Sequence, residues 1–406
     1  MPAQAQLKPR PDAFPPANEE YYPKAVQMAS TVAEMASWDR YPTYDTYLAM
    51  MQQWATDFPT LCHIDTIGTS VQGRLILSMY IQPQTFDELY RPEFFYSSTI
   101  HGDEVTGYVM MLHLIDTLLH GYGSNPQYTD LINRTRISIN PLANPDGTYH
   151  RGNNTVQGSW RYNANWVDLN RNYPNPFNPS KDPLPQENAA MIAYVSAHNF
   201  RLSANLHGGA EVMNYPWDSF TSQQQPHPYA DWWVDVCRRF VDTSRTYNTN
   251  HFNDTYNCGY TAGGDWYVIS GGRQDYMNAV HNCLELTMEI STQKTLSSDR
   301  LPEYWQFLQH PLVNYISEIH NLPGNNGLAG IDNSKFNIEI YPNPSYGSVA
   351  IDGLPEGQPV ILCDITGRTL RHFTSVGGTL TVDISTLPSG IYMLRCGGQV
   401  AKFVKR

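Results

Sequence analysis

The chain has 406 residues, more than one hydrophobic core usually holds, so we expect two domains. It carries 26 basic and 38 acidic residues, for a net charge of −12, and has no basic patch, which argues against nucleic acid or an anionic membrane as a partner. No apolar run approaches the length needed to cross a bilayer. Residues 1–40, rich in Pro, Ala and Glu, are expected to form a flexible or clamping lead-in.

The first chemically informative segment is a strand-like run at residues 94–100 that ends in His101-Gly102-Asp103-Glu104 and continues as a helix-like stretch at 105–119. An imidazole and a carboxylate three residues apart, where a buried strand gives way to a helix, can converge on one metal ion at the carboxyl edge of a sheet. Taken alone, His-x-x-Glu is a weak signal, and an exposed polar turn is an equally good interpretation until a third ligand is found.

A third candidate ligand, His207, ends another short buried strand at residues 201–206. Two glycines follow it and let backbone pass close to a site. Two histidines and one glutamate, with a fourth position left to water, are the ligand set of a catalytic zinc rather than a structural one, and the chain has no Cys-x-x-Cys pair. We therefore predict one zinc ion per chain, held by His101, Glu104 and His207.

Together with further motifs, these segments resemble the zinc metallocarboxypeptidases, most closely their N/E or regulatory branch. The motifs occur in the family's order within residues 41–322: His101–Glu104, Asn144–Gly147, Asn163–Asn165, Val167–Pro174, Ser203–Gly209, Asn214–Asp218, Asp265–Tyr267, Gly271–Tyr276 and Glu285–Glu289. The resemblance implies an enzyme that removes one residue from the carboxyl end of a peptide or protein. It implies for residues 41–322 an α/β/α sandwich with a mixed, twisted sheet, and we expect covering helices at 105–119, 186–198, 229–247 and 303–320.

The resemblance also assigns roles to individual residues. Asn170 and Arg171 correspond to the pair that holds the substrate's terminal carboxylate, a task suited to the planar, always charged guanidinium. Arg161 corresponds to the arginine that polarises the scissile carbonyl and stabilises the developing oxyanion. Tyr267 resembles the mobile tyrosine that closes over the terminal residue. The alternatives without a functional role are surface ion pairs for the two arginines and an ordinary half-buried aromatic residue for Tyr267.

Two carboxylates compete for the role of general base. Glu285 and Glu289 lie four residues apart in a β-branched, apolar run at 284–290, so both project from the same face of a buried strand. A carboxylate on such a strand is costly unless it is paired or functional. The family places its base at the second position, so Glu289 is predicted to take a proton from the attacking water and deliver it to the leaving amine. Glu285 is the structural alternative.

Specificity depends on a few positions in the pocket. In the regulatory branch, preference for carboxyl-terminal Lys or Arg goes with an acid in the Tyr-Pro-x-Asp segment, here Asp218, and Gln274 stands at the base of the pocket. An acid at the wall and an uncharged polar residue at the base predict a cationic side chain. Arg273 departs from many relatives. Inside the pocket it would neutralise Asp218 and weaken the preference, whereas pointing to solvent it would change nothing.

The carboxyl-terminal segment differs from what precedes it. A turn-rich linker at 323–334 leads to about seven short β-branched segments within 335–406, a pattern that predicts a small all-β sandwich. Stretches at 341–344, 387–392 and 402–406 resemble a sorting domain of the type IX secretion system, which implies that machinery as a partner and export across a Gram-negative outer membrane. A transthyretin-like sandwich is the alternative. Cys363 and Cys396 are equally consistent with a disulfide or with two free, buried thiols.

We thus expect a secreted, monomeric zinc carboxypeptidase that prefers carboxyl-terminal Lys or Arg. One alternative is the same activity with a preference for apolar ends. Another is a zinc amidase or peptidase acting on peptidoglycan stem peptides, which shares the zinc ligands but is disfavoured by the set of Arg161, Asn170, Arg171, Tyr267 and Asp218. A third is a non-catalytic peptide-binding or display module, which would be marked by a lost ligand or a lost base.

Overall fold

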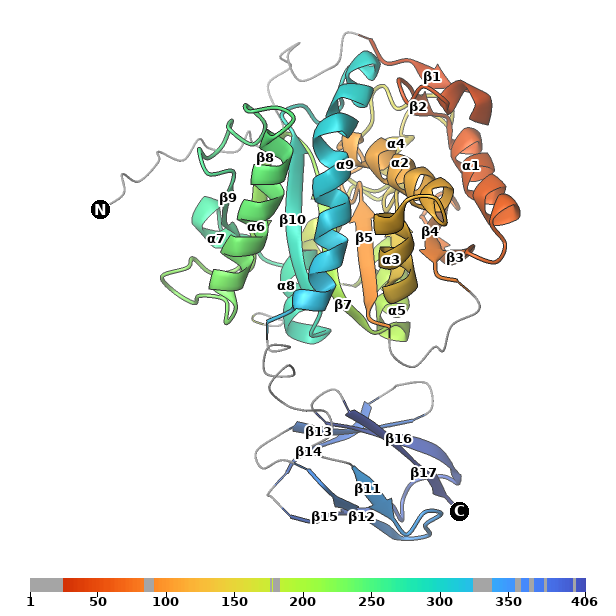
Figure 1. Ribbon diagram of the computed structural model, residues 1–406, viewed down its shortest axis with the longest axis vertical. Helices are drawn as coiled ribbons and strands as arrows, with labels where there is room; N and C mark the ends of the chain where they lie inside the picture. Colours follow the sequence, from red (N-terminus) through yellow and green to blue (C-terminus); the bar gives the residue numbers. More distant parts are fainter. Residues whose placement is uncertain are drawn as a thin grey trace. The chain divides into compact units, whose positions relative to one another are not determined.

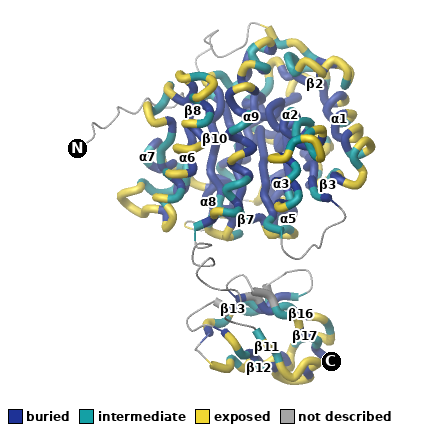
Figure 2. The backbone as a smooth tube through the Cα atoms, in the orientation of Figure 1, coloured by how far each residue is buried: buried dark blue, intermediate teal, exposed yellow. Residues whose placement is uncertain are grey.

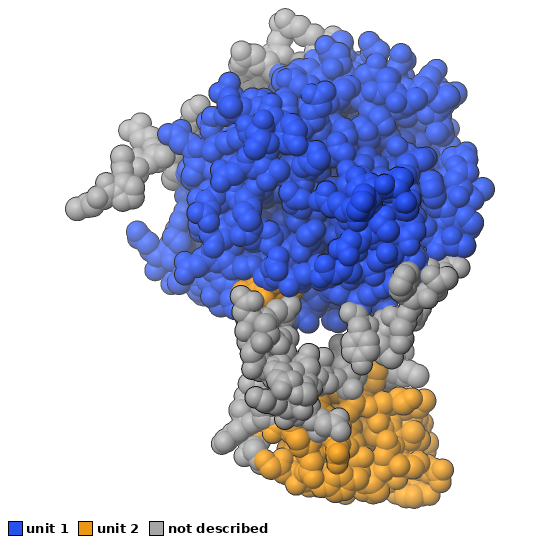
Figure 3. All heavy atoms as spheres, viewed as in Figure 1, with its two compact units in different colours: residues 1–321 blue, residues 322–406 orange. Residues whose placement is uncertain are grey.

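The computed structural model describes residues 25–83, 91–175, 177, 183–323, 338–354, 359–364, 369–375, 378–396 and 399–406. The chain divides into two compact units, of which the first ends at Asn321 and the second begins at Leu322 (Figure 3). Of the predicted linker, residues 324–334 lie outside the described part of the chain, as do residues 1–24 of the predicted lead-in.

The first unit is built on an eight-stranded mixed sheet (Figure 1). In spatial order its strands are β3 (Cys62–Thr69), β4 (Leu75–Ile81), β6 (Arg136–Asn140), β5 (Glu93–Ser98), β7 (Phe200–His207), β10 (Leu284–Ser291), β8 (Ala210–Tyr215) and β9 (Tyr260–Ala262). The central strands β6, β5, β7 and β10 run parallel to one another. Their flanking neighbours β4 and β8 run antiparallel to them.

Helices cover both faces of this sheet. The longer ones are α1 (Tyr44–Asp57), α2 (Thr106–Gly121), α3 (Pro126–Arg134), α5 (Gln186–Ala197), α6 (Ala230–Arg245), α8 (Arg273–Val280) and α9 (Leu301–Ser317). Short turns of helix are α4 (Pro145–Thr148), α7 (Gly263–Trp266) and 3-10 segments at Val32–Met35, Leu169–Arg171, Ser298–Arg300 and Glu318–Asn321. The helices predicted at 105–119, 186–198, 229–247 and 303–320 correspond to α2, α5, α6 and α9.

Successive residues of β5 show the layering, because side chains alternate between the faces of a sheet. The ring of Phe94 packs 5.8 Å from that of Tyr315 on α9. The ring of Phe95 packs on the other face, in a core cluster with Tyr194 of α5 and Tyr276 of α8. All six residues of β5 are buried, as expected of a parallel strand covered on both sides (Figure 2). The predicted α/β/α sandwich with a mixed sheet is confirmed.

The described part of the lead-in lies against the first unit. Strand β1 (Met28–Ala29) pairs in parallel with β2 (Tyr41–Pro42). Upstream of β1, Gln27 donates its backbone N–H to Ser298 Oγ at 2.8 Å, and the Ser298 N–H donates to Ala25 O at 3.1 Å. From residue 25 onward the segment is therefore clamped onto the unit.

The second unit consists of two antiparallel sheets in the part of the chain that the structure describes. One sheet holds β11 (Glu339–Tyr341), β12 (Ser348–Asp352) and β15 (Leu380–Asp383). The other holds β14 (Thr369–Thr374), β13 (Pro359–Asp364), β16 (Gly390–Cys396) and β17 (Gln399–Lys405). Both sheets contribute to one apolar core, with Val349 and Ile351 from the first sheet and Leu362 and Phe403 from the second. The predicted all-β sandwich is confirmed.

The two cysteines of this unit are buried and form no disulfide with each other. In the β13–β16 ladder Cys363 lies opposite Met393, whereas Cys396 lies opposite Val360. The offset of three residues separates them by about 10 Å along the strands, beyond the reach of a disulfide. Of the two interpretations left open by the sequence, the disulfide between Cys363 and Cys396 is therefore wrong.

A buried acid ties three parts of the first unit together. Glu211, near the start of β8, accepts hydrogen bonds from Phe252 N at 3.0 Å and from the Tyr304 hydroxyl of α9 at 3.0 Å. Its own N–H donates to the Asp254 carboxylate. Burial, reinforced by the charge of Asp254, raises the pKa of Glu211 from 4.5 to about 7.

This shift predicts how stability depends on pH. Between pH 4.5 and 7 the folded protein keeps a proton on Glu211 that the unfolded chain has lost. The contribution is complete below the unfolded pKa and is lost as pH rises through the folded one. Urea titrations of wild type from pH 5 to 8 should therefore show a fall in unfolding free energy on the order of 2–3 kcal/mol from this group. Glu211→Gln should remove that component.

The matched control is Glu303→Gln, which changes an exposed carboxylate on α9 and should leave the wild-type profile intact. His251 Nε2 lies 3.5 Å from Glu211 Oε1, but burial lowers the pKa of this histidine to about 4, so its folded-state titration lies below the pH range of the comparison. An identical pH profile for wild type and Glu211→Gln would contradict the assignment.

Candidate metal centre and active site

The three predicted metal ligands meet at the carboxyl ends of adjacent strands. His207 ends β7, and His101 and Glu104 follow β5, which pairs with β7 through Ser98 opposite Leu206. The Nδ1 atoms of the histidines lie 3.1 Å apart, and His101 Nδ1 lies 3.1 Å from Glu104 Oε1. All three side chains are buried.

This donor set fits a zinc ion. Ligand atoms about 2.0–2.1 Å from a tetrahedral centre lie roughly 3.3 Å from one another, close to the separations seen here. The donors, two imidazole nitrogens and a carboxylate oxygen, are those that zinc prefers in catalytic sites, and all lie within 4.8 Å of one another. Burial alone would raise the pKa of Glu104, but His101, Lys294 and His207 lower it well below its usual range, which favours the ionised, ligating form.

The loop that carries His101 is tightly constrained. Thr99, a β-branched residue, has a φ of +63°, a conformation that is strained for its side chain. A Cβ on Gly102 would lie 2.4 Å from the backbone of Gly147, so only glycine allows this close approach. The Asn144–Gly147 motif thus forms the wall against which the metal-binding loop packs.

Two residues that had no predicted role orient the histidines. His101 Nε2 lies 3.3 Å from Asp168 Oδ1, and His207 Nε2 lies 3.0 Å from the side-chain amide of Asn205. A metal-binding imidazole usually donates its second N–H to such a partner, which fixes the ring orientation. The Asn205 atom that faces His207 Nε2 is Nδ2, so a His207 that binds zinc through Nδ1 and carries its proton on Nε2 requires the amide to be flipped, with its oxygen accepting that proton.

Asp168 also holds Arg161. The Arg161 Nε and Nη2 atoms lie 3.0 and 2.9 Å from Asp168 Oδ2, and Nη1 lies 3.1 Å from His101 Nδ1. Burial alone would lower the pKa of Arg161, but Asp168 and Glu104 raise it. The structure therefore brings a permanently charged guanidinium to the edge of the metal site, where it can stabilise negative charge on a reacting carbonyl oxygen.

The competing acids on β10 have different surroundings. Glu289 pairs in register with His207, so it lies directly beside a candidate metal ligand. Glu285 pairs in register with Ser203, four residues deeper in the sheet. Its Oε2 accepts hydrogen bonds from Ser203 Oγ at 2.7 Å and Arg273 Nη2 at 3.0 Å.

The residues expected to bind substrate lie around the start of α8. Gln274 donates from Nε2 to Asp218 Oδ1 at 3.0 Å, so the predicted wall and base of the pocket are in contact. Asn170 Oδ1 accepts the Arg273 N–H at 2.9 Å, and the half-buried Arg171 follows Asn170 directly. Tyr267 is half-buried at the end of α7, with its ring 5.0 Å from that of Trp266.

The interpretation in which Arg273 points to solvent is wrong, because the residue is fully buried. Its Nη2 atom lies 3.0 Å from Glu285 Oε2, so the guanidinium is paired with a carboxylate other than Asp218. Pairing across 12 residues, between a helix start and a strand, leaves no local pattern in the sequence.

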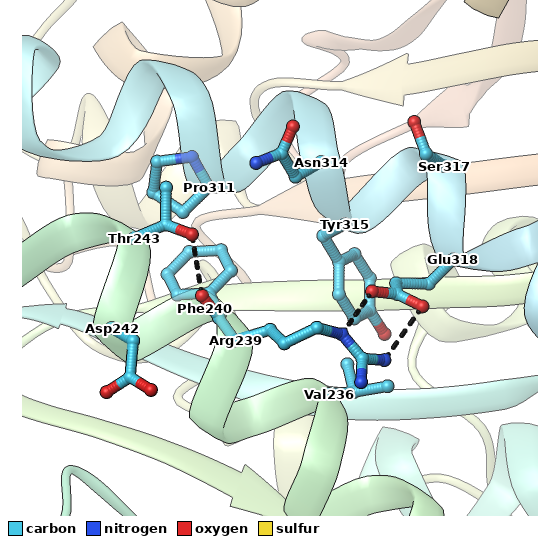
Figure 4. Close-up of a pocket in the computed structure, with 10 residues that line it drawn as sticks. All are labelled: Val236, Arg239, Phe240, Asp242, Thr243, Pro311, Asn314, Tyr315, Ser317 and Glu318. Atoms are coloured by element: carbon cyan, nitrogen blue, oxygen red, sulfur yellow. Dashed lines mark hydrogen bonds and ion pairs between the residues drawn. The ribbon is translucent and has the colours of Figure 1, made fainter.

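A separate cavity of about 430 Å³ lies between α6 and α9 (Figure 4). Arg239 lines this cavity, but its charge is neutralised by Glu318, because Arg239 Nε and Nη2 donate to Glu318 Oε1 and Oε2 at 2.8 and 2.9 Å. None of the predicted site residues lines the cavity. The cavity has no part in the metal site.

The contacts of Asp168 lead to a testable prediction. Asp168→Asn should retain the fold but weaken zinc affinity by about ten- to a hundredfold, the usual effect of losing a partner of a metal-binding histidine. Competition with a chromophoric chelator measures this without reference to catalysis. His207→Ala is the positive control, since loss of a ligand should abolish tight binding, and Asp235→Asn, on the exposed side of α6, is the neutral one. Equal zinc affinity of wild type and Asp168→Asn would contradict the proposed role.

Comparison with known proteins agrees with this geometry. Residues 47–309 match the zinc carboxypeptidase family. Carboxypeptidase D of Rattus norvegicus is 33% identical over 284 residues, which cover 66% of this chain and 20% of that protein. The carboxypeptidase N catalytic chain of Rattus norvegicus is 32% identical over 319 residues, which cover 69% of each. The chain thus spans about a fifth of the length of carboxypeptidase D. The solved carboxypeptidase A of Helicoverpa armigera shares the fold, with a TM-score of 0.60 at 19% identity, covering 72% of this chain and 76% of that one.

Residues 339–406 match the secretion system C-terminal sorting domain, so the transthyretin-like alternative for the second unit is wrong. This domain indicates export by a type IX secretion system to the cell surface or beyond. None of the helices in the described part of the chain has the length and apolar character that a membrane span requires. The predicted resemblance to the N/E branch is confirmed, and the chain belongs to the zinc carboxypeptidase family.

Proposed function

We propose that the protein is an exported zinc carboxypeptidase that hydrolyses the last peptide bond of peptides or proteins and prefers carboxyl-terminal Lys or Arg. The observation that carries the proposal is the cluster of three ligand atoms with the Arg161 guanidinium 3.1 Å from one of them. A metal site and a fixed cation at one sheet edge supply what hydrolysis of an unactivated amide requires.

Each residue then has a distinct task. His101, Glu104 and His207 would hold one zinc ion, which supplies Lewis acidity toward water and the scissile carbonyl. Glu289, beside His207, would accept a proton from the attacking water and pass it to the departing amine. Arg161, held by Asp168, would face the carbonyl oxygen as negative charge develops there.

The carboxyl end of the substrate would be held on the far side of Arg161. Asn170 and Arg171 would provide an amide and a guanidinium that bind the terminal carboxylate of the substrate. The planar guanidinium can bind both carboxylate oxygens, which accounts for selectivity toward a free carboxyl terminus. Tyr267, partly exposed at the end of a short helix, would close over the bound residue. These contacts support an exopeptidase rather than an endopeptidase or an amidase.

Glu289→Gln separates chemistry from binding. The variant should keep zinc and peptide affinity but lose turnover by a hundred- to ten-thousandfold, because only the positioned proton transfer is removed. The test is a scan of matched short peptides that differ only in the last residue, with metal content measured on the same sample. Full activity in Glu289→Gln, or activity on muropeptides but not on Lys-ended peptides, would contradict the proposal.

The pocket supports a basic preference. Asp218 is 4% exposed, and its Oδ1 lies 2.0 Å from the position that a Cβ on Gly263 would take. A Cβ on Gly272 would lie 3.3 Å from Oδ2 of the same carboxylate. The two glycines let this buried carboxylate pack closely against their backbone, and the uncharged side chain of Gln274 donates a hydrogen bond to it. A lysine or arginine side chain provides the complementary charge.

Asp218→Asn tests this selectivity. Activity on Arg-ended peptides should fall roughly 30-fold or more, because the substrate cation would lose its charged partner in a desolvated pocket, while activity on Leu-ended peptides should change little. The readout is kcat/KM for both peptides. A wild type that prefers apolar ends, or an equal loss on both substrates, would show that Asp218 is structural and that the apolar alternative holds.

A further inference from the structure

Arg273 and Glu285 form a fully buried ion pair beneath the proposed substrate pocket. Both residues are 0% exposed, and Arg273 Nη2 lies 3.0 Å from Glu285 Oε2. Ser203 Oγ on β7 donates to the same oxygen at 2.7 Å, and the guanidinium carbon lies 4.9 Å over the ring of Phe95 on β5. The side chain of Arg273 thus contacts β10 through Glu285 and β5 through Phe95, while β7 holds Glu285 through Ser203.

Stability alone is a poor explanation for this pair. Two guanidinium nitrogens of Arg273, Nε and Nη1, and Oε1 of Glu285 are buried without a hydrogen-bond partner among the described residues. Buried pairs with such unsatisfied atoms are often no more stabilising than apolar residues of similar size. Arg273 also occupies the first position of α8, where the helix dipole disfavours a cation.

The turn that the pair anchors carries both sets of substrate contacts. The backbone N–H of Arg273 donates a hydrogen bond to Asn170 Oδ1 at 2.9 Å. The next residue, Gln274, donates from Nε2 to Asp218 Oδ1 at 3.0 Å. Asn278, one turn later, donates to Gln274 O at 2.9 Å and Glu285 O at 2.8 Å, which joins α8 to β10 a second time. A shift of this turn would move the carboxylate-binding and side-chain-binding groups together.

The pair also has an electrostatic consequence. An unpaired guanidinium next to Gln274 would oppose a cationic substrate side chain, whereas Glu285 neutralises it within the protein. We propose that Arg273 and Glu285 act as a positioning pair, which fixes Asn170 and Gln274 for substrate and keeps the floor of the pocket electrically neutral. This inference rests on the proposed function and explains how a cation is tolerated beneath a pocket for Lys or Arg.

The experiment uses the full chain, loaded with zinc, and two peptides that differ only in a terminal Lys or Leu. Arg273→Met should raise KM for both peptides about tenfold while kcat changes less than about twofold, because binding groups move and the chemical groups do not. Glu285→Gln leaves the cation unpaired, so the Lys-to-Leu ratio of kcat/KM should fall about three- to thirtyfold, within the usual range for coupled charges. The double variant Arg273→Met/Glu285→Met should restore that ratio.

Zinc content and thermal midpoints measured on every variant separate a positioning role from a structural one. If single variants fail to fold, Arg273→Lys, which keeps the charge but not the planar fork, should fold and give an intermediate KM. A wild type that cleaves neither peptide would overturn the proposed function and the inference with it. An active wild type, with variants that lose thermal stability but keep KM and the Lys-to-Leu ratio, would overturn the inference alone.

Discussion

The active site depends on the in-register pairing of three parallel strands, β5, β7 and β10. Ser98 lies opposite Leu206, and His207 lies opposite Glu289, so the ends of the three strands present their polar residues at one edge. A slip of one residue would turn every side chain of a strand to the other face of the sheet. Because both faces are covered by helices, that slip would bury charge among apolar side chains, and the register is strongly specified.

The same pairing explains why the clustering of the three candidate metal ligands could be predicted from sequence. A polar residue at the end of an apolar run is visible locally, and parallel strands bring their carboxyl ends together. His101 and His207 satisfied both conditions, and Glu104 followed at a spacing that a turn can close. The sandwich and the four long helices were predictable for a similar reason, since each depends on a run of apolar residues with its own period.

The contacts that the sequence did not predict depend on partners that are distant in the chain or on the register between strands. Asp168 was visible in a motif, yet its contact with His101 requires the loop at 160–168 to fold over the metal-binding turn. Asn205 could have been found, because it lies two residues before His207 and therefore on the same face of β7. The fate of Cys363 and Cys396 depends on the register between β13 and β16, which the spacing of cysteines does not reveal.

The two acids of β10 are the same residue type, and it is their surroundings that suit them to different roles. Glu285 and Glu289 project from the same face of one strand, but Glu285 is neutralised by a buried arginine and hydrogen-bonded to Ser203. Glu289 lies two residues from the carboxyl end of β10, beside the candidate metal ligand His207. Although burial raises the pKa of Glu285, this carboxylate is fully buried and bound by Arg273 and Ser203, so it is not placed to exchange a proton with an attacking water. The pairing of Glu285 with Arg273 thus favours Glu289 as the general base that we propose.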